Sequence, residues 1–249
     1  MKSSFIQKIG IFIFAIGALV GFAMALLLTW ANFELPFYFE RSYFSVSTPT
    51  TEKLELSCPL LLTTVDDGAI KAYLPNTTDK TINLDFRVQV SFMEGIEREL
   101  QFNPEVLSGE TGVVDVKIDS ADRFYNMFIL MRAFQFPTYK TPARAGSCAV
   151  VMLPFNFVDG SEALLLILGI LILFMGGGLL LFARINKPLV KKNKSIFNSM
   201  VVTTVFIGIA IAAGVLSYWV LGIIMLAVIF LQTVAVFIFF GDNERKNWR

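Results

Sequence analysis

The sequence predicts a membrane α-helical protein with four transmembrane helices and, outside the cytoplasm, an all-β sandwich domain. The chain of 249 residues is 55% hydrophobic and has a mean hydropathy of +0.65. Its apolar residues gather in long uncharged runs, which are typical of membrane-spanning helices. Between the first two runs lies a long segment in which apolar and polar residues alternate, as they do in half-buried strands.

The uncharged runs define the helices. Residues 9–30 hold no charge over 22 positions, 163–183 none over 21, and 196–240 none over 45. A helix of about 20 residues crosses a hydrocarbon core of about 30 Å, so the third run predicts two spans and the others one each. Ser217, Tyr218 and Trp219 mark the turn within the third run, because Tyr and Trp favour the membrane interface. We therefore predict transmembrane helices over residues 9–30, 162–184, 197–216 and 219–240.

The first run also has features of a cleaved signal peptide. Lys2 and Lys8 precede its apolar residues, and Ala23-Met24-Ala25 provides the small residues of a cleavage site. However, signal peptides have an apolar core of about 7–15 residues, and this run continues past that site to Trp30. We predict an uncleaved anchor.

Basic residues predict the orientation of the helices. Lys and Arg in short segments stay on the cytoplasmic side, whereas long domains are translocated largely regardless of charge. Residues 1–8 hold two Lys and no acid, and the long segment 31–161 holds 11 basic and 17 acidic residues. We predict that residues 1–8, the loop 185–196 and the tail 241–249 are cytoplasmic, and that 31–161 is extracytoplasmic.

The predicted cytoplasmic loop and the residue before it contain five basic residues and no acid, and we call these five the basic cluster. They are Arg184, Lys187, Lys191, Lys192 and Lys194. Beside an acidic membrane each base is worth about 1 kcal/mol, so the cluster is a candidate contact for anionic lipid or for a cytoplasmic protein. Topology determination alone accounts for the same residues.

Seven short strands are predicted at about residues 53–155, separated by turns. They cover Leu54–Leu62, Ala69–Leu74, Thr81–Phe92, Ile96–Phe102, Val114–Ile118, Phe124–Phe136 and Ala149–Leu153. This pattern predicts an antiparallel sandwich, and about 100 residues suffice to bury its core. In the Thr81–Phe92 strand we expect Gln89 and Ser91 on the solvent face, since they alternate with apolar residues.

Cys58 falls in the first predicted strand and Cys148 at the start of the last. Because thiols oxidise outside the cytoplasm, we predict a disulfide between them. The alternative is two separate buried thiols. Two cysteines are too few for a four-thiolate metal site, and the sequence has no histidine, so we predict no metal, no cofactor and no enzymatic activity.

The predicted spans contain no ionisable residue, and Gln232 is the clear amide within them. We expect Gln232 to bond another helix, and the alternative is that it bonds a substrate. Small residues recur at four-residue spacing at Gly17, Gly21 and Ala25, and in the pairs Gly208 with Ala212 and Ala210 with Gly214. Packing within one bundle explains this spacing better than a dimer face does.

Two further motifs have simple structural interpretations. The aromatic segment Phe33–Phe44 is explained by an interfacial belt of aromatic residues better than by a ligand cage. The sequence Asn76-Thr77-Thr78 matches an N-glycosylation acceptor, but a turn in which Asn and Thr bond the backbone explains it as well.

The predicted layout resembles the claudins in outline, with four spans, both termini inside and two cysteines in a β-rich outer loop. The claudin signature of Trp, Gly-Leu-Trp and two nearby cysteines is missing, because the outer loop has no Trp after Trp30 and its cysteines are 90 positions apart. The outer domain likewise resembles an immunoglobulin-like sandwich without the usual central Trp. Neither resemblance implies a function here.

We therefore predict a non-enzymatic multi-pass protein of the cell membrane. Its outer sandwich would present a surface to a protein partner, as an accessory or interaction subunit does. The alternative is a component of a transporter or channel for an apolar or lipid substrate, since such a path needs no charge. Membrane lipids are the other expected partners, and the near balance of 21 basic and 20 acidic residues argues against nucleic acid.

Overall fold

In the computed structural model the chain forms two compact units. The sandwich unit is Ala31–Leu164, and the helical unit combines Met1–Trp30 with Leu165–Arg249. The structure describes residues 2–40, 52–66, 68–92, 97–138, 141–186 and 191–247.

The helices follow the uncharged runs of the sequence. They are α1 (Lys2–Glu40), α2 (Gly160–Leu171), a π-helical turn (Ile172–Gly176), α3 (Gly177–Ile185), α4 (Lys191–Val215) and α5 (Trp219–Asn247). Within the described residues, the apolar stretches Phe5–Phe39, Gly160–Ile185 and Lys194–Val215 are long enough to cross a membrane, and Trp219–Ala235 is shorter. The count of four spans stays a prediction.

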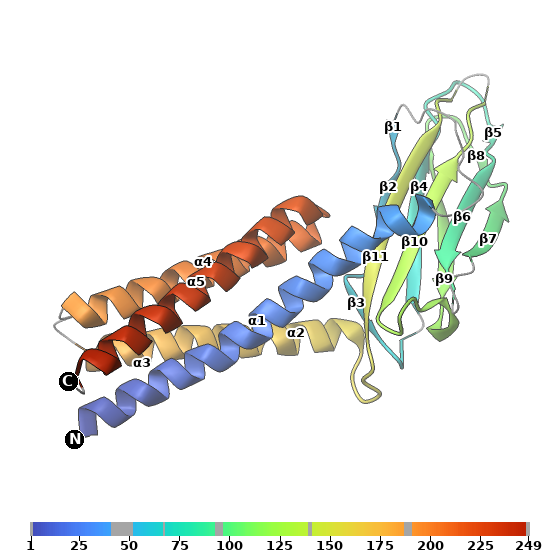
Figure 1. The fold of residues 1–249 in the computed structure, drawn as a ribbon. Helices are drawn as coiled ribbons and strands as arrows, with labels where there is room; N and C mark the ends of the chain where they lie inside the picture. The colour runs from blue at the N-terminus through green and yellow to red at the C-terminus, as the bar shows by residue number, and fades with distance from the viewer. Residues whose placement is uncertain are drawn as a thin grey trace. The chain divides into compact units, whose positions relative to one another are not determined.

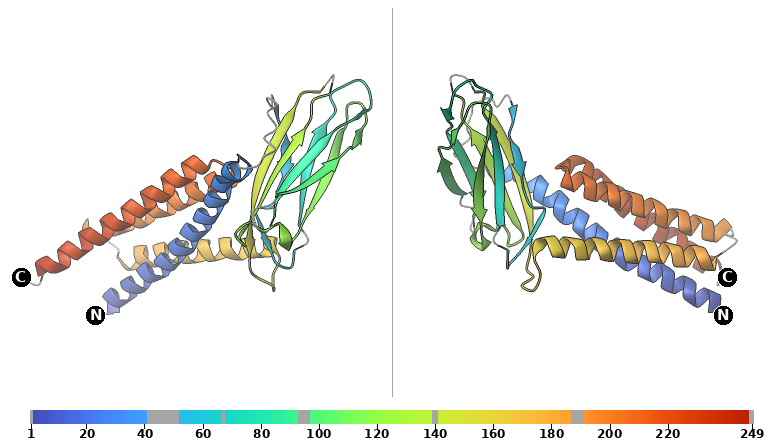
Figure 2. Two further views of the ribbon diagram at one scale, coloured as in Figure 1. Left: turned by 45° about the vertical axis from the view of Figure 1, so that its right-hand side comes forward. Right: turned by 180° about the vertical axis from the view of Figure 1, so that it is seen from behind.

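Both ends of the described chain lie at one end of the helical unit (Figure 1). The Lys2 end of α1, the Asn247 end of α5 and the two helix ends around the α3–α4 connection lie at one end of this unit (Figures 1 and 2). At the other end, α4 finishes where Ser217 adopts a φ of 60°. The N–H of Ser217 donates to Gly214 O (3.2 Å) and that of Tyr218 to Ala213 O (2.8 Å), which is the Schellman pattern of helix ends.

Small residues let these helices approach closely. A Cβ atom at Gly17 would lie 2.8 Å from Met175, and one at Gly214 would lie 2.7 Å from Leu28. Ala25 and Ala210 are fully buried together. These contacts support packing within the helical unit, whereas a Cβ atom at Gly208 would meet nothing within 4 Å.

The sandwich unit is built from short strands in two main sheets that pack face to face (Figures 1 and 2). The larger sheet has the order β1-β11-β10-β6-β7, with β3 also paired to β11, and the smaller has the order β2-β4-β9, while β5 and β8 form a separate pair. The strands are β1 (Glu52–Lys53), β2 (Glu55–Ser57), β3 (Leu61–Thr63), β4 (Gly68–Pro75), β5 (Ile82–Asn83), β6 (Phe86–Ser91), β7 (Glu97–Phe102), β8 (Glu105–Val106), β9 (Thr111–Ile118), β10 (Phe128–Gln135) and β11 (Arg144–Leu153).

Several predictions about the strands were wrong. The strand predicted over Thr81–Phe92 is divided between β5 and β6. The predicted strand Leu54–Leu62 is divided between β2 and β3, with Cys58 between them. The strand predicted over Phe124–Phe136 begins only at Phe128, because Tyr125 and Asn126 adopt positive φ angles of 51° and 56° in a tight turn. The sandwich is not wholly antiparallel, since β1 and β3 each pair with β11 in parallel.

Part of the outer face of the larger sheet is covered, which the alternation in the sequence does not predict. Val88 and Val90 point into the core as expected, but Gln89 and Ser91 are also buried, at 4% and 0% exposure. The last turns of α1 lie on this face, where the N–H of Phe92 donates to the hydroxyl oxygen of Tyr38 (3.4 Å). A second layer therefore excludes water from positions that look solvent-facing in the sequence.

The prediction that the aromatic residues of Phe33–Phe44 form an interfacial belt was wrong for Tyr38 and Phe39. The helix α1 continues to Glu40, and Tyr38 and Phe39 are buried within the sandwich unit. The ring of Tyr38 packs edge-on against Phe124 at 4.7 Å between centroids. The rest of the aromatic segment, 41–44, lies outside the described residues.

Candidate functional site

The two cysteines lie together in the structure. Cys58 follows β2 of the smaller sheet, Cys148 lies in β11 of the larger sheet, and the two form a disulfide with a Cα–Cα distance of 6.6 Å. Both side chains are partly buried against the core between the sheets. The bond therefore joins the two layers of the sandwich.

The basic cluster is only partly described. Arg184 is exposed in the last turn of α3, and Lys194 is exposed in the first turns of α4. Lys191 and Lys192 begin α4, but their side chains, like Lys187 as a whole, lie outside the described residues. The contact with anionic lipid stays a prediction.

The side chain of Asn76 is bonded within its turn. Its side chain is 2% exposed, and its Nδ2 donates to three carbonyl oxygens, those of Lys80, Val106 and Leu107, at 2.9–3.0 Å. Its Oδ1 accepts from the N–H of Thr78 at 2.9 Å. The turn interpretation accounts for all these bonds, and the folded sandwich leaves the amide inaccessible.

Asp66 ties the sandwich to the beginning of α2. One oxygen, Oδ2, accepts from the backbone N–H of Thr63 (2.6 Å), from the Thr63 hydroxyl (3.1 Å) and from the N–H of Gly160 (2.9 Å). Thr63 also donates its hydroxyl to Val158 O at 2.8 Å. Because Gly160 is the first residue of α2, this carboxylate also lies at the positive end of a helix dipole.

We expect Asp66→Ala to lower the free energy of unfolding of the sandwich by about 2–3 kcal/mol. The change removes the acceptor of three hydrogen bonds and leaves buried donors unpaired. Thermal unfolding of the full chain in mild detergent measures the effect. The control is Glu110→Ala at an exposed turn, for which we expect a change within about 0.5 kcal/mol. Equal effects of the two changes would contradict the role of Asp66.

A partly buried ion pair lies at the same end of the sandwich. Asp122 is fully buried, and its Oδ2 accepts from Arg98 at 2.7 Å and from the N–H of Asp119 at 2.9 Å. Its backbone oxygen accepts from Ser91, whose Oγ in turn accepts from the N–H of Leu130. Burial raises the pKa of Asp122, although the N–H of Asp119 and the Arg98 guanidinium lower it in part.

The raised pKa of Asp122 predicts a pH dependence of stability. A carboxyl group whose pKa is higher in the folded state stabilises that state most at low pH, and this contribution is lost as pH rises through the folded-state pKa. The melting temperature of the native chain minus that of Asp122→Asn should therefore increase as pH falls from about 7 to about 4. A difference that is constant or decreases with falling pH would show that the pairing with Arg98 outweighs burial.

Gln232 bonds a neighbouring helix, as the sequence predicts. Its Nε2 on α5 lies 3.0 Å from Ser199 O and 3.1 Å from Thr203 Oγ1, both on α4.

In the described chain, no group of three or more His, Cys, Asp or Glu side chains is placed to hold a metal ion.

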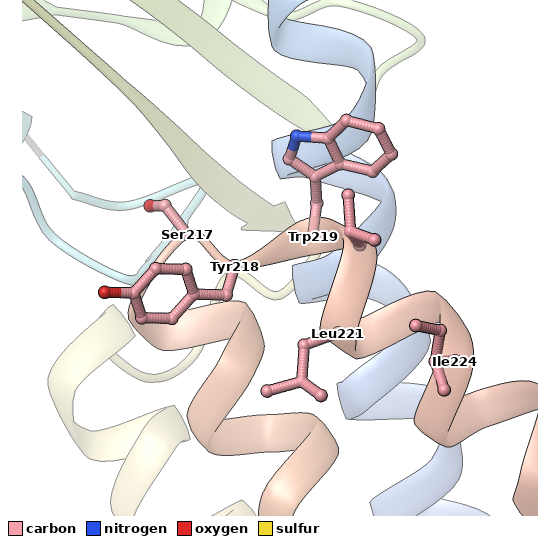
Figure 3. Close-up of a pocket in the computed structure, with 6 residues that line it drawn as sticks. Ser217, Tyr218, Trp219, Leu221 and Ile224 are labelled. Atoms are coloured by element: carbon pink, nitrogen blue, oxygen red, sulfur yellow. The ribbon is translucent and has the colours of Figure 1, made fainter.

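Each unit has a hollow that its described residues line. One of about 200 Å³ in the sandwich unit lies between the last turns of α1, at Leu35 and Phe39, and Arg132 of β10. The other, of about 510 Å³, is a shallow hollow at the α4–α5 turn, where Tyr218, Leu221 and Ile224 project from the chain beside Trp219 (Figure 3). Its walls are apolar and offer no convergent polar groups, so it suits an acyl chain better than a polar ligand.

The comparisons leave the class of protein open. No protein-family model matches the chain, and no curated protein matches it. The CARDB domain of the PF1109 protein from Pyrococcus furiosus, determined in complex with di-metal ions, is 9% identical, covers 41% of this chain and 93% of its own, and has a TM-score of 0.31. β-Glucuronidase 2 from Bacteroides uniformis is 13% identical over 40% of this chain and 13% of its own, with a TM-score of 0.28. Likenesses this weak carry no argument about function.

Sequence reasoning missed the roles of Asp66, Asp122 and Tyr38. Asp119 and Asp122 form a reciprocal capping box around a short 3₁₀ helix, Ser120–Asp122, and this spacing is a signal that the sequence does contain. The roles of Tyr38 and Asp66 depend on partners far along the chain, at Phe92 and Gly160. No local pattern indicates those contacts.

Proposed function

We propose that this chain is a non-enzymatic multi-pass protein of the cell membrane that presents its sandwich outside the cytoplasm to a protein partner. The observation that carries the proposal is the anchoring of the sandwich at both of its chain connections. The last turns of α1 lie on its larger sheet through Tyr38, and the first residue of α2 is bonded to Asp66. A domain held at both connections suits a binding module carried by helices.

The proposed orientation has two supports. The helix ends that adjoin Arg184 and Lys194 lie at the same end of the helical unit as the Lys2 end of α1 and the Asn247 end of α5 (Figure 1). Basic residues gathered on one side favour the cytoplasm for that side. The Cys58–Cys148 disulfide favours an oxidising compartment for the sandwich.

We place the partner contact on the outer face of the smaller sheet. The last turns of α1 lie over part of the larger sheet, whereas β4 and β9 present exposed side chains of both charges around Val113, which is 52% exposed. These are Lys71 on β4 and Asp115 and Lys117 on β9. Mixed charge around an exposed apolar residue suits a protein surface better than an anionic polymer.

A pull-down of the tagged full chain from gentle detergent, followed by native mass measurement and mass spectrometry, tests the proposal. We expect a stoichiometric protein partner that is lost in Val113→Glu and retained in Leu107→Glu, a matched control at a residue that is 53% exposed in the loop after β8. A monodisperse monomer, together with no partner after crosslinking in cells, would contradict the proposal.

A second candidate is a transporter or channel component for an apolar or lipid substrate. The observation in its favour is the π-helical turn Ile172–Gly176 in the second apolar stretch, because π turns are frequent at functional sites. Gly169, Gly176 and Gly177 face open space around this turn. This function predicts a stoichiometric co-purified lipid and transport in liposomes, and the absence of both would remove it.

A further inference from the structure

One end of the sandwich carries exposed apolar side chains on three separate loops. We call this set the apolar rim, and it consists of Val65 (49% exposed), Tyr125 (62%), Met127 (42%), Phe155 (38%) and Phe157 (73%). Val65 lies between β3 and β4, Tyr125 and Met127 precede β10, and the two Phe residues follow β11. Soluble domains seldom expose such a group of large apolar residues without a binding role.

Hydrogen bonds hold the three loops together at this end. Thr64 donates its N–H (3.0 Å) and its hydroxyl (2.6 Å) to Phe155 O, which joins the first loop to the third. The N–H of Met152 donates to Met127 O at 2.7 Å, which joins the second loop to β11. The rings of Phe155 and Phe157 lie 5.5 Å apart. The rim is therefore a built surface rather than scattered side chains.

The rim adjoins the point where the chain enters a membrane-spanning stretch. The apolar helix begins at Gly160, three residues after Phe157, and the N–H of Gly160 donates to Asp66 in the Val65 loop. The opposite end of the sandwich, where Gly109 N–H donates to Asn76 O, exposes Leu107 with the polar neighbours Ser108 and Glu110. Among the described residues, the rim end exposes more large apolar side chains than the opposite end, as expected if the rim end meets lipid.

The charges at this end indicate what drives the contact. Asp66 and Asp122 are committed to internal hydrogen bonds, and Arg98 pairs with Asp122. Among the other described charges, Asp119, Asp159 and Glu162 are exposed and Arg123 is half-buried, so the exposed charges are mainly acidic. Exposed acids repel anionic lipid, so burial of the apolar side chains must supply the attraction. Tyr and other aromatic side chains favour the headgroup region of a bilayer.

We infer that the apolar rim inserts into the outer leaflet of the bilayer at the level of the headgroups. This inference rests on the proposed function, because it requires that α2 begins a membrane span. It assigns the rim a lipid surface as its partner and leaves the outer face of the smaller sheet for a protein.

Depth-dependent quenching in the full chain tests the inference. The native cysteines are joined in a disulfide, so a single introduced cysteine can be labelled with the fluorophore NBD. The positions are Phe157→Cys and Tyr125→Cys in the rim, Leu107→Cys at the opposite end, and Leu165→Cys, which is 69% exposed on α2. Each labelled protein is reconstituted in phosphatidylcholine vesicles that carry nitroxide lipids in both leaflets.

We expect the nitroxide lipids to quench NBD several-fold more at positions 157, 125 and 165 than at 107, and high salt to leave this pattern unchanged. Quenching at 165 with none above the level of 107 at both rim positions would overturn the inference while leaving the span intact. Absence of quenching at 165 as well would overturn the proposed membrane span.

Discussion

Replacement of both cysteines, as Cys58→Ala with Cys148→Ala, is expected to lower the free energy of unfolding of the sandwich by up to about 4.6 kcal/mol. The disulfide spans a sequence separation of 90, and the entropy lost by the unfolded chain on closing a loop of that length has this magnitude. The bond also joins β11 to the segment after β2, so its loss removes the covalent link between the two sheets. Thermal unfolding in detergent measures the change.

Treatment with reductant is the matched control for this prediction. The native chain should lose stability when reduced, and the double variant should be insensitive to reductant because it has no thiol left. Native protein that melts at the same temperature with and without reductant, after reduction is verified by thiol titration, would contradict the prediction.

Gly178→Leu is expected to destabilise the helical unit by about 3 kcal/mol or more, whereas Gly177→Leu is expected to be tolerated. A Cβ atom at Gly178 would lie 2.7 Å from the backbone N of Phe14 and 2.8 Å from Gly10 O. These are backbone atoms of α1, which cannot move aside without separating the two helices. A Cβ atom at Gly177 would meet nothing within 4 Å.

The two neighbouring glycines form their own control, since each substitution removes one glycine from the same helix turn. The measurement is the fraction of full chain that stays monodisperse after heating in detergent. Leucine at position 177 should leave the melting temperature unchanged or raise it slightly, because glycine is a poor helix former. Similar losses of stability at both positions would show that the close contact of Gly178 with Gly10 and Phe14 does not explain the effect.

Much of the architecture could be predicted because its causes are local. The uncharged runs place the helices, and Ser217 and Tyr218 mark the turn that ends α4 at Val215. Period-two alternation places the inward residues of β6 and β9, since the sandwich core needs one apolar face per strand. The cysteine pairing was predictable because two cysteines allow a single intramolecular bond.

The remainder depends on contacts between distant parts of the chain. The parallel pairing of β1 with β11 joins Glu52 to Arg144, and alternation within a strand does not encode the direction of its neighbour. The sequence pattern predicts a solvent-facing Ser91, because it does not reveal that the Ser91 hydroxyl bonds Asp122 O and the N–H of Leu130. Asp66 reads as a turn residue, although its partner at Gly160 is 94 positions away.

The parallel pairing of β1 with β11 also has a mechanical consequence. The chain enters the sandwich before β1 and leaves it after β11, so tension between α1 and α2 would pull these strands lengthwise in opposite directions. Their hydrogen bonds and the Arg144–Glu52 ion pair (2.8 Å) would then share the load in shear instead of opening one by one. Beyond that point the force would pass through the Cys58–Cys148 bond, and the 89 residues between the two cysteines would be shielded from extension.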